Sequence, residues 1–286
     1  MTPKQLVAHL EVVVGISGRP RRLLNCMEDE LRQHFGLPAV QAAEVAERLE
    51  VSVRDLIIVR QEEAQSNGVL SILTLADERQ RSVCGSCWEK GTDSAAVREG
   101  KKRRLQVEPM LTIIRNLSFR EFEHFGAKVL KVLGASTSYV TPQSNDQGID
   151  FYGTISLGQY AQGPAPFFKL AHDVSLRFAG QAKHYPNIAV GPAVVRELIG
   201  SIALARYRVF TRGPEMFENL SLLPMNPLLC MIFTTGRFTK GAMEIAEKAG
   251  VIVRSGEQLA VFLADCGVGY VEGVFNPDTF HEWLSK

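Results

Sequence analysis

One acidic residue and a Gln-x-Lys triplet, 31 positions apart, are the residues of this chain best suited to chemistry. Asp150 closes a glycine-containing turn and leads into an apolar run, and Gln181-Ala182-Lys183 closes a second apolar run. Alternate residues of a strand share a face, so Gln181 and Lys183 are expected side by side, and a hairpin could place Asp150 next to them. A carboxylate, an amide oxygen and an ammonium at one sheet edge suit metal-assisted attack of water on a phosphodiester.

A purely structural interpretation of the same residues stays open at this point. Asp150 could simply start a strand after a glycine turn, and Lys183 could be a solvent-facing strand end. His184 follows Lys183 but should point to the opposite face of the strand, so a structural role is expected for it. The same structural role is expected for His124.

The elements that must position these residues can be traced from capping and periodicity. Ser118, with Glu121 three residues later, matches a capping box that starts a helix. Glu123 lies at the margin of that helix's apolar stripe, where it could face a buried site. Strands are expected around 138–141, 149–155 and 176–183, followed by a helix from Pro192 to about Tyr207. A buried strand is expected at 228–233, and then a helix that starts after Thr239 and ends at Gly250. A strand at 251–253 and a helix at 256–266 complete the order.

This order of elements predicts an α/β domain with a mixed sheet that is parallel in its later part. The stretches Gly158–Pro166 and Pro214–Pro227 are expected to be loops or insertions. A polar segment at 91–104 reads as a linker, which divides the chain into domains at 1–104 and 105–286.

Composition sets the broad class. The 286 residues are 45% hydrophobic and 22% charged, as in ordinary globular proteins. No apolar run approaches the ~20 residues of a membrane helix, and the start of the chain lacks a signal-peptide pattern. Five cysteines without a regular pattern favour a reducing cytoplasm. No phosphate-binding glycine loop ending in Lys-Ser/Thr is present, which argues against an NTP-driven motor.

Residues ~117–263 resemble the catalytic domain of Mrr-like restriction endonucleases, in the PD-(D/E)XK nuclease superfamily. Five pieces occur in the expected order, and only their combination is specific. They are Glu121-Phe122-Glu123, Asp146-Gln147-Gly148-Ile149-Asp150, Gln181-Ala182-Lys183, Val195-Arg196-Glu197-Leu198, and Phe233-Thr234-Thr235-Gly236 followed by Phe238-Thr239-Lys240.

The resemblance implies a role for each site residue. Asp150 would be the main carboxylate ligand of Mg²⁺, for which Mn²⁺ can substitute. Gln181 stands where a second acid is usual, and the backbone carbonyl of Ala182 would add a ligand. Lys183 would orient or help deprotonate the attacking water and stabilise the transition state. Glu123 would be an outer ligand, and Asp146 is either a further acid or an Asx residue that shapes the turn.

The first hundred residues are expected to form a smaller, mainly helical domain. Helices at 28–35, 39–49 and 53–66 are indicated, with a tight turn at Glu50–Ser52 and Ser52 as an N-cap. This arrangement is similar to the helix-turn-helix of winged-helix domains, with 68–73 and 80–88 as the wing. A small helical interaction domain is the alternative.

Two local features of this region leave their own alternatives open. Cys84 and Cys87 have metal-knuckle spacing, with Cys26 and His34 as remote further ligands, but ordinary hairpin cysteines are expected. The net charge is only +1, so DNA contacts must come from local patches such as Arg19–Arg22 and Lys101–Arg104, which could equally be solvated loop charges.

We therefore expect a Mg²⁺-dependent DNA endonuclease of restriction and antiviral-defence type, acting on double-stranded DNA. A homodimer is expected because cutting both strands usually needs two active sites. The N-terminal domain would select the site or bind a protein partner, and no membrane association is expected. The alternatives are a structure-directed repair or recombination nuclease and a catalytically silent DNA-binding or effector-sensing protein on the same fold.

Overall fold

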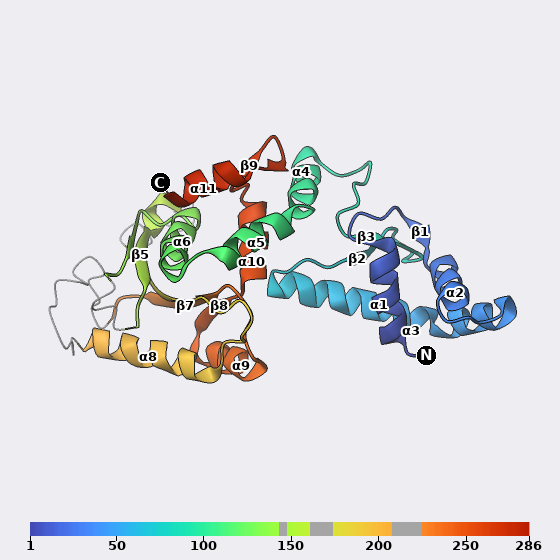
Figure 1. The fold of residues 1–286 in the computed structure, drawn as a ribbon, viewed down its shortest axis with the longest axis horizontal. Helices are drawn as coiled ribbons and strands as arrows, with labels where there is room; N and C mark the ends of the chain where they lie inside the picture. The colour runs from blue at the N-terminus through green and yellow to red at the C-terminus, as the bar shows by residue number, and fades with distance from the viewer. Residues whose placement is uncertain (143–147, 161–173, 208–224, 286) are drawn as a thin grey trace. The chain divides into compact units, whose positions relative to one another are not determined.

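The computed structural model describes residues 1–142, 148–160, 174–207 and 225–285. The chain divides into two compact units (Figure 1). The first unit comprises Met1–Glu108 with Gly267–Thr279, and the second comprises Pro109–Cys266 with Phe280–Lys286. The functional boundary at 104/105 stays a prediction. Among the described helices, none combines the length and apolar character that crossing a bilayer requires.

The first unit is mainly helical, as expected. Its small antiparallel sheet has the order β1-β3-β2, and its core is a cluster of buried apolar residues on α1, α2 and α3. The elements are α1 (Pro3–Val14), β1 (Arg21–Arg22), α2 (Leu23–Gln33), α3 (Ala39–Asn67), β2 (Leu73–Leu75), β3 (Ser82–Gly85), α4 (Ala95–Arg104), β9 (Tyr270–Val271) and β10 (Val274–Phe275).

The predicted helix-turn-helix is wrong. One continuous 29-residue helix, α3, replaces the two helices and the turn at Glu50–Ser52. The segment contains no Gly or Pro to break a helix, and the Arg54 side chain donates to Glu50 Oε1 at 2.6 Å across the expected turn. The buried positions continue on one face through the whole length, at Ala42, Ala46, Val53, Ile57 and Ala64. A helix-turn-helix module is therefore not formed here.

Two neighbouring expectations have different outcomes. The hairpin expected from 68–73 and 80–88 exists as the antiparallel pair β2–β3. The residues expected to be a linker instead contain α4, which Ser94 caps by accepting a hydrogen bond from Val97 N. Four basic residues in the last turn of α4 suit the negative end of the helix dipole.

Helix α1 is absent from the sequence expectations, although Thr2, Pro3 and Gln5 form a capping box with proline at the first helical position.

The remaining elements form the α/β part of the chain. Its five-stranded sheet has the order β4-β5-β6-β7-β8, antiparallel from β4 to β6 and parallel from β6 to β8. The elements are α5 (Val107–Asn116), α6 (Phe119–Val132), β4 (Thr137–Val140), β5 (Phe151–Ser156), the 3-10 helix η1 (Leu157–Tyr160), β6 (Ser175–Lys183), α8 (Pro192–Arg206), β7 (Leu228–Thr234), α9 (Lys240–Ala249), β8 (Val251–Arg254), α10 (Gly256–Asp265) and α11 (Pro277–Ser285).

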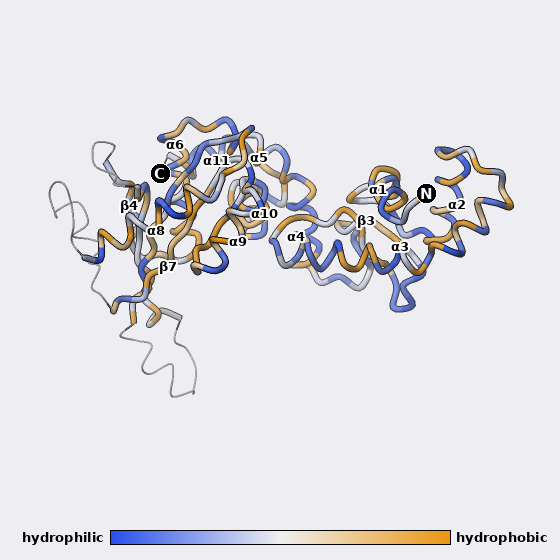
Figure 2. Tube along the Cα trace, turned by 90° about the horizontal axis from the view of Figure 1, so that it is seen from below, coloured by the Kyte–Doolittle hydropathy of each residue, from blue (hydrophilic) through white to orange (hydrophobic). Residues whose placement is uncertain are grey.

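Helices cover both faces of this sheet (Figure 1). Helix α6 packs so closely on one face that a Cβ on Gly126 would lie 2.5 Å from the Phe151 ring. Helices α8 and α9 cover the other face, in a core that includes Tyr152, Val195 and Ala242. The inner strand β7 is apolar along nearly its whole length (Figure 2), as suits a strand with neighbours on both edges and both faces. The expected mixed, helix-flanked sheet is confirmed.

The expected caps are also present. Ser118 and Glu121 form the predicted capping box of α6, Thr239 caps α9, and Gly250 ends α9 in the left-handed region at φ 69°. Of the predicted loops at Gly158–Pro166 and Pro214–Pro227, residues 161–166 and 214–224 lie outside the described residues.

Candidate active site

Asp150 is fixed at the point where β5 meets β6. Its backbone N–H donates to Gly180 O at 2.9 Å, and its carbonyl accepts from Thr141 N at 2.9 Å. Its carboxylate oxygen Oδ2 accepts from Ala182 N at 2.7 Å, a charge-assisted bond that stabilises the buried anion. Only 7% of the residue is exposed, so Asp150 is not a solvated strand start.

Gln181 shares a sheet face with Asp150. In the antiparallel pair Phe151 lies opposite Gly180, and a Cβ on Gly180 would clash with the Phe151 ring, so these two positions share one face. The adjacent residues, Asp150 and Gln181, therefore both point to the other face. The expected hairpin between them is present, with β5 and β6 as its strands.

The amide of Gln181 is buried and half satisfied. Its Nε2 donates to Glu197 Oε1 on α8 at 3.4 Å, while Oε1 has no hydrogen-bond partner among the described residues, although only 1% of the residue is exposed. A buried oxygen without a partner is costly unless something outside the protein chain satisfies it. Glu197 was part of the matching sequence pattern without an assigned role, and the structure makes it the group that orients Gln181.

Ala182 and Lys183 complete the triplet. In a strand the N–H and C=O of one residue point to the same edge, so the Ala182 carbonyl faces the side on which Asp150 lies. Lys183 points to the same face as Gln181 by strand alternation. Its ammonium forms no ion pair within the part of the chain that the structure describes. Parallel pairing places Lys183 beside Thr234 at the end of β7.

Glu123 is connected to this site indirectly. Its Oε2 pairs with Arg120 Nη1 at 2.6 Å, and the same nitrogen donates to Thr141 O at 2.8 Å. Thr141 N in turn donates to Asp150 O. The ion pair engages Oε2 of Glu123, and Arg120 links this carboxylate to Thr141, the residue hydrogen-bonded to Asp150. Asp146, the remaining acidic candidate, lies outside the described residues.

The two histidines next to site residues differ from each other. His184 Nε2 lies 3.1 Å from Arg115 O, and its ring packs edge-on against Phe119 at 5.0 Å. This supports the structural role that was expected. The His124 side chain is exposed. Its pKa is lowered, with partial burial of the ring as the largest cause and the charge of Arg120 as the second.

A basic surface beside the site escaped the sequence interpretation. Helix α6 carries Arg120, His124, Lys128 and Lys131 at positions that share one helical face. With Tyr139 and other residues they line a surface cavity of about 340 Å³ between α6 and β4. We call the surface formed by these four side chains the α6 basic face. The sequence signal for it was their spacing of four, four and three residues along the helix.

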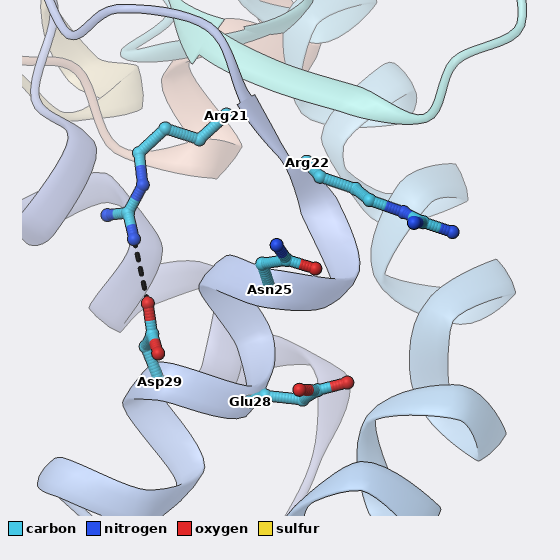
Figure 3. Close-up of a pocket in the computed structure, with 5 residues that line it drawn as sticks. All are labelled: Arg21, Arg22, Asn25, Glu28 and Asp29. Atoms are coloured by element: carbon cyan, nitrogen blue, oxygen red, sulfur yellow. Dashed lines mark hydrogen bonds and ion pairs between the residues drawn. The ribbon is translucent and has the colours of Figure 1, made fainter.

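The two basic runs of the first unit are less available for contact with phosphate than the sequence alone suggested. Arg21 pairs with Asp29 at 2.8 Å, and the cavity of about 450 Å³ around them is lined by two arginines and two acids (Figure 3). Arg22 extends away from that pair, on the other side of Asn25 (Figure 3). This lining is balanced in charge and does not by itself favour phosphate.

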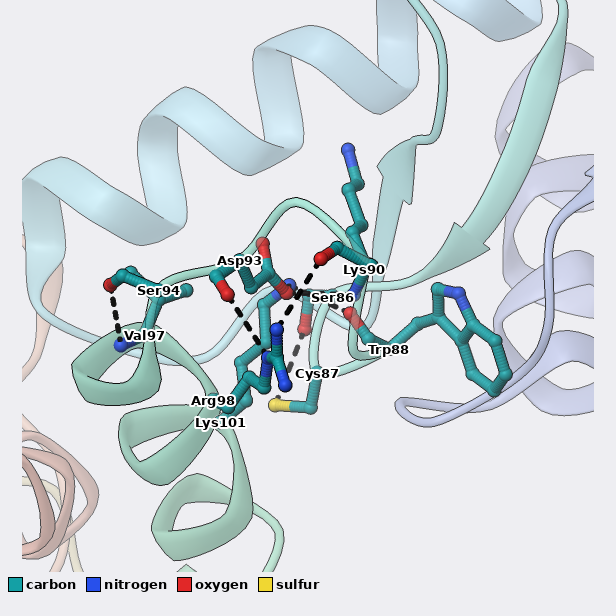
Figure 4. A network of polar contacts seen from close by, with 10 residues as sticks. Ser86, Cys87, Trp88, Lys90, Asp93, Ser94, Val97, Arg98 and Lys101 are labelled. Atoms are coloured by element: carbon teal, nitrogen blue, oxygen red, sulfur yellow. Dashed lines mark hydrogen bonds and ion pairs between the residues drawn. The ribbon is translucent and has the colours of Figure 1, made fainter.

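Lys101, from the second basic run, is part of an internal network (Figure 4). Its Nζ donates to Trp88 O and to Asp93 Oδ2, both at 2.7 Å. The Lys101 ammonium is the largest cause of the lowered pKa of Asp93. Cys84 and Cys87, on the preceding hairpin, are both buried, and burial raises the pKa of the Cys84 thiol, which favours the protonated form over a metal-binding thiolate.

Residues 114–211 match a family model described as Restriction endonuclease (Mrr_cat). This span contains Glu123, Asp150, Gln181 and Lys183, and the resemblance to Mrr-like restriction endonucleases is confirmed for it. The span is about a third of the chain. No curated protein matches the sequence.

Three solved structures are similar to parts of this chain. The MspJI restriction endonuclease in complex with a 27-mer oligonucleotide is 19% identical, with a TM-score of 0.39 over 69% of this chain and 39% of that one. The DNA modification-dependent restriction endonuclease AspBHI is 18% identical, with a TM-score of 0.39 over 69% and 43%. The restriction endonuclease FokI is 12% identical, with a TM-score of 0.35 over 98% and 45%. The chain thus spans about two fifths of the length of these structures.

Proposed function

We propose that this chain is a divalent-metal-dependent endonuclease of restriction type that hydrolyses phosphodiester bonds in double-stranded DNA. The family match at residues 114–211 supports the reaction class. The observation that carries the proposal is the unpartnered buried oxygen of Gln181, on the same sheet face as the carboxylate of Asp150. A carboxylate oxygen and an amide oxygen on one sheet face are donors that suit a hard cation.

The residues fit Mg²⁺ on chemical grounds. Asp150 and Gln181 would hold the ion, with the carbonyl of Ala182, and Glu123 would act through water while it remains paired with Arg120. Mn²⁺ would bind the same oxygens. When bound, the ion supplies Lewis-acid polarisation of the phosphate and lowers the pKa of a coordinated water.

The chain's own groups perform the remaining tasks. Lys183 donates hydrogen bonds at the site face, where it orients the attacking water and stabilises negative charge that develops on the phosphate. Glu197 holds the amide of Gln181 with its nitrogen outward, so the oxygen stays directed toward the site. The burial of Asp150 and Gln181 limits competition from bulk water.

The α6 basic face is our candidate for contact with the phosphate backbone. Arg120 belongs to it and also donates to Thr141 O, next to Asp150 along the β4–β5 pair. Lys128 and Lys131 add charge farther along the helix. Such contacts position a duplex without reading its sequence, so they leave base recognition to other parts of the protein.

The test is DNA cleavage by the full chain in Mg²⁺, with methylated, unmethylated and branched duplexes as substrates. We expect the wild type to nick or cut at least one of them. Lys183→Ala should lower the rate at least about a hundredfold, the range found when one transition-state-stabilising group is lost, while leaving DNA binding within about threefold. Lys248→Ala, at an exposed position on α9, is the matched control and should cut like the wild type.

Asp150→Asn tests whether activity is lost through removal of the anionic ligand rather than through loss of the fold. Asparagine keeps an oxygen that can accept from Ala182 N but removes the anionic ligand. We expect a folded, inactive protein. Equal inactivity of the wild type and both site variants on all three substrates would overturn the proposal.

A further inference from the structure

Three side chains from two helices of the first unit converge beside its core. His9 lies on α1, Glu30 lies on α2, and His34 is the residue that caps the end of α2. Their ligand atoms all lie within 4.8 Å of one another. Glu30 and His34 are four residues apart on a helix and therefore share a face, whereas His9 is brought to them only by the packing of α1 on α2.

Glu30 has an unusual environment for a carboxylate. Only 5% of it is exposed, yet in the described structure its carboxylate makes no hydrogen bond. Its single ionic neighbour is His9 Nδ1, at 3.8 Å from Oε2, which is too long for a hydrogen bond. A largely buried carboxylate without a hydrogen bond is stabilised when a further positive group binds it.

The two imidazoles are arranged around this carboxylate. The rings of His9 and His34 are 4.2 Å apart and tilted by 55°, and Phe35 packs edge-on against both. Two protonated imidazoles at this distance would repel each other, but two neutral ones can share a cation through their ring nitrogens. The Phe35 ring gives the cluster an apolar wall, which shields it on one side from solvent.

We propose that His9, Glu30 and His34 form a binding site for a divalent transition metal, Zn²⁺ in the first place. Two histidine nitrogens and one carboxylate oxygen are a recurrent zinc ligand set, with water in the fourth position. Tetrahedral coordination needs ligand atoms roughly 3.3 Å apart, so the present positions require only side-chain rotation. The partial exposure of His34 leaves the fourth position open to water.

The site would join the start of the chain to α2. Helix α1 is otherwise held against α2 and α3 by apolar packing, through Leu6, Val7 and Leu10, and by the ion pair of Glu11 with Arg60 at 2.6 Å. A metal bound only in the folded state stabilises it in proportion to the logarithm of the free metal concentration. The proposal does not depend on the nuclease function, because all three ligands lie in the first unit.

Zinc binding to the full chain tests the proposal. Protein stripped with a chelator is titrated with Zn²⁺ against a chromophoric competitor, in an Asp150→Asn background that removes the other candidate metal site. We expect one zinc per chain and a Tm raised by roughly 5–10 °C at a zinc concentration ~100-fold above the Kd. His34→Gln should lower the affinity at least about tenfold, since it removes one of three ligands at an exposed position.

Matched variants show whether zinc binds at these three ligands. His281→Gln, an exposed histidine of the second unit, should bind zinc like the parent. Glu30→Gln should also weaken binding, and its metal-free Tm shows whether the fold is retained. Co²⁺ in place of Zn²⁺ should give visible bands of tetrahedral type, without the near-ultraviolet charge-transfer bands that a thiolate ligand produces.

Three results would overturn the assignment. One is stoichiometric zinc binding that survives both His34→Gln and Glu30→Gln. Another is binding that is lost in Cys84→Ala, with thiolate bands in the Co²⁺ spectrum, which would place the ion on the hairpin cysteines instead. Absence of zinc binding at micromolar concentrations counts against the proposal in the same way.

Discussion

The carboxylate of Asp150 accepts a hydrogen bond from the backbone of β6 and belongs to the metal site that we propose. Oδ2 accepts the Ala182 N–H just before β5 begins, beyond the last backbone pair of β5 and β6. Local structure and chemistry are therefore coupled at one residue. Gln181 has the opposite character, because its nitrogen is bound by Glu197 and its oxygen is unpartnered.

The contact between Gln181 and Glu197 gives a prediction at this scale. Gln181→Glu would place a second carboxylate near 3.4 Å from Glu197 Oε1, where the amide nitrogen now donates. We expect this change to cost about 1–3 kcal/mol in the free energy of unfolding, since exposure of Glu197 screens part of the repulsion. Urea denaturation at neutral pH measures the cost.

The double variant Gln181→Glu with Glu197→Gln is the control. It restores a donor opposite the new carboxylate, so most of the lost stability should return. Equal costs of Gln181→Glu with and without Glu197 would show that the two side chains do not interact.

At the scale of elements, helix α3 shows how a local signal can mislead. Ser52 before an apolar residue resembles an N-cap, but capping residues also occur in helix interiors when nothing breaks the chain. The buried positions on either side of it, from Ala46 to Val53 and Ile57, continue on one face. Tertiary packing against α1 and α2 favours the uninterrupted helix.

Two substitutions at Ser52 distinguish a helix interior from a cap. Ser52→Ala should leave the free energy of unfolding unchanged or raise it by a few tenths of a kcal/mol, because alanine is the better interior residue. An N-cap serine would instead lose about 1 kcal/mol. Ser52→Pro should cost about 3 kcal/mol or more in a continuous helix. Thermal unfolding followed by circular dichroism measures both, and a destabilising alanine together with a tolerated proline would contradict the single helix.

Helix α6 presents three faces of different character. Its apolar stripe packs on the sheet through Phe122 and Phe125, Glu123 lies at the margin toward Thr141, and the α6 basic face looks outward. The capping box and the stripe are local patterns, so the sequence predicted this helix correctly. The basic face was equally local and could have been found from the same periodicity.

At the scale of the whole molecule, a net charge of +1 means that DNA affinity must depend on where the charges lie. Arg21 and Lys101 are both engaged in ion pairs, so two of the basic residues that looked available are partly neutralised. The α6 basic face keeps Lys128 and Lys131 at its surface. We therefore expect this face to contribute more to phosphate binding than either basic run.

Salt dependence of DNA binding tests this expectation. Each phosphate contact contributes a slope of about 0.9 to the plot of log K against log salt. The double variant Lys128→Ala with Lys131→Ala should lower the slope by about 1–2 and weaken binding to all sequences alike. Lys101→Ala should leave the slope unchanged and lower the Tm instead, because it breaks the network with Asp93. A slope that responds to Lys101 and not to Lys128 and Lys131 would assign DNA binding to the first unit.

The sequence by itself determined the α/β part of the molecule and its polar triplet. Strand alternation, capping residues and the left-handed Gly250 act within a few residues, so the order of elements from Ser118 to Asp265 could be read directly. The side-by-side placement of Asp150 and Gln181 also followed, because a hairpin register is constrained by its alternating faces.

Only the tertiary structure decided how these groups are satisfied. The contacts of Gln181 with Glu197, of Glu123 with Arg120 and of His9 with Glu30 depend on how helices pack on strands and on one another. So does the choice of one long α3 over two short helices. Such contacts join residues far apart in the chain or select among rotamers, and their energies appear only when the packed core fixes the distances between the elements.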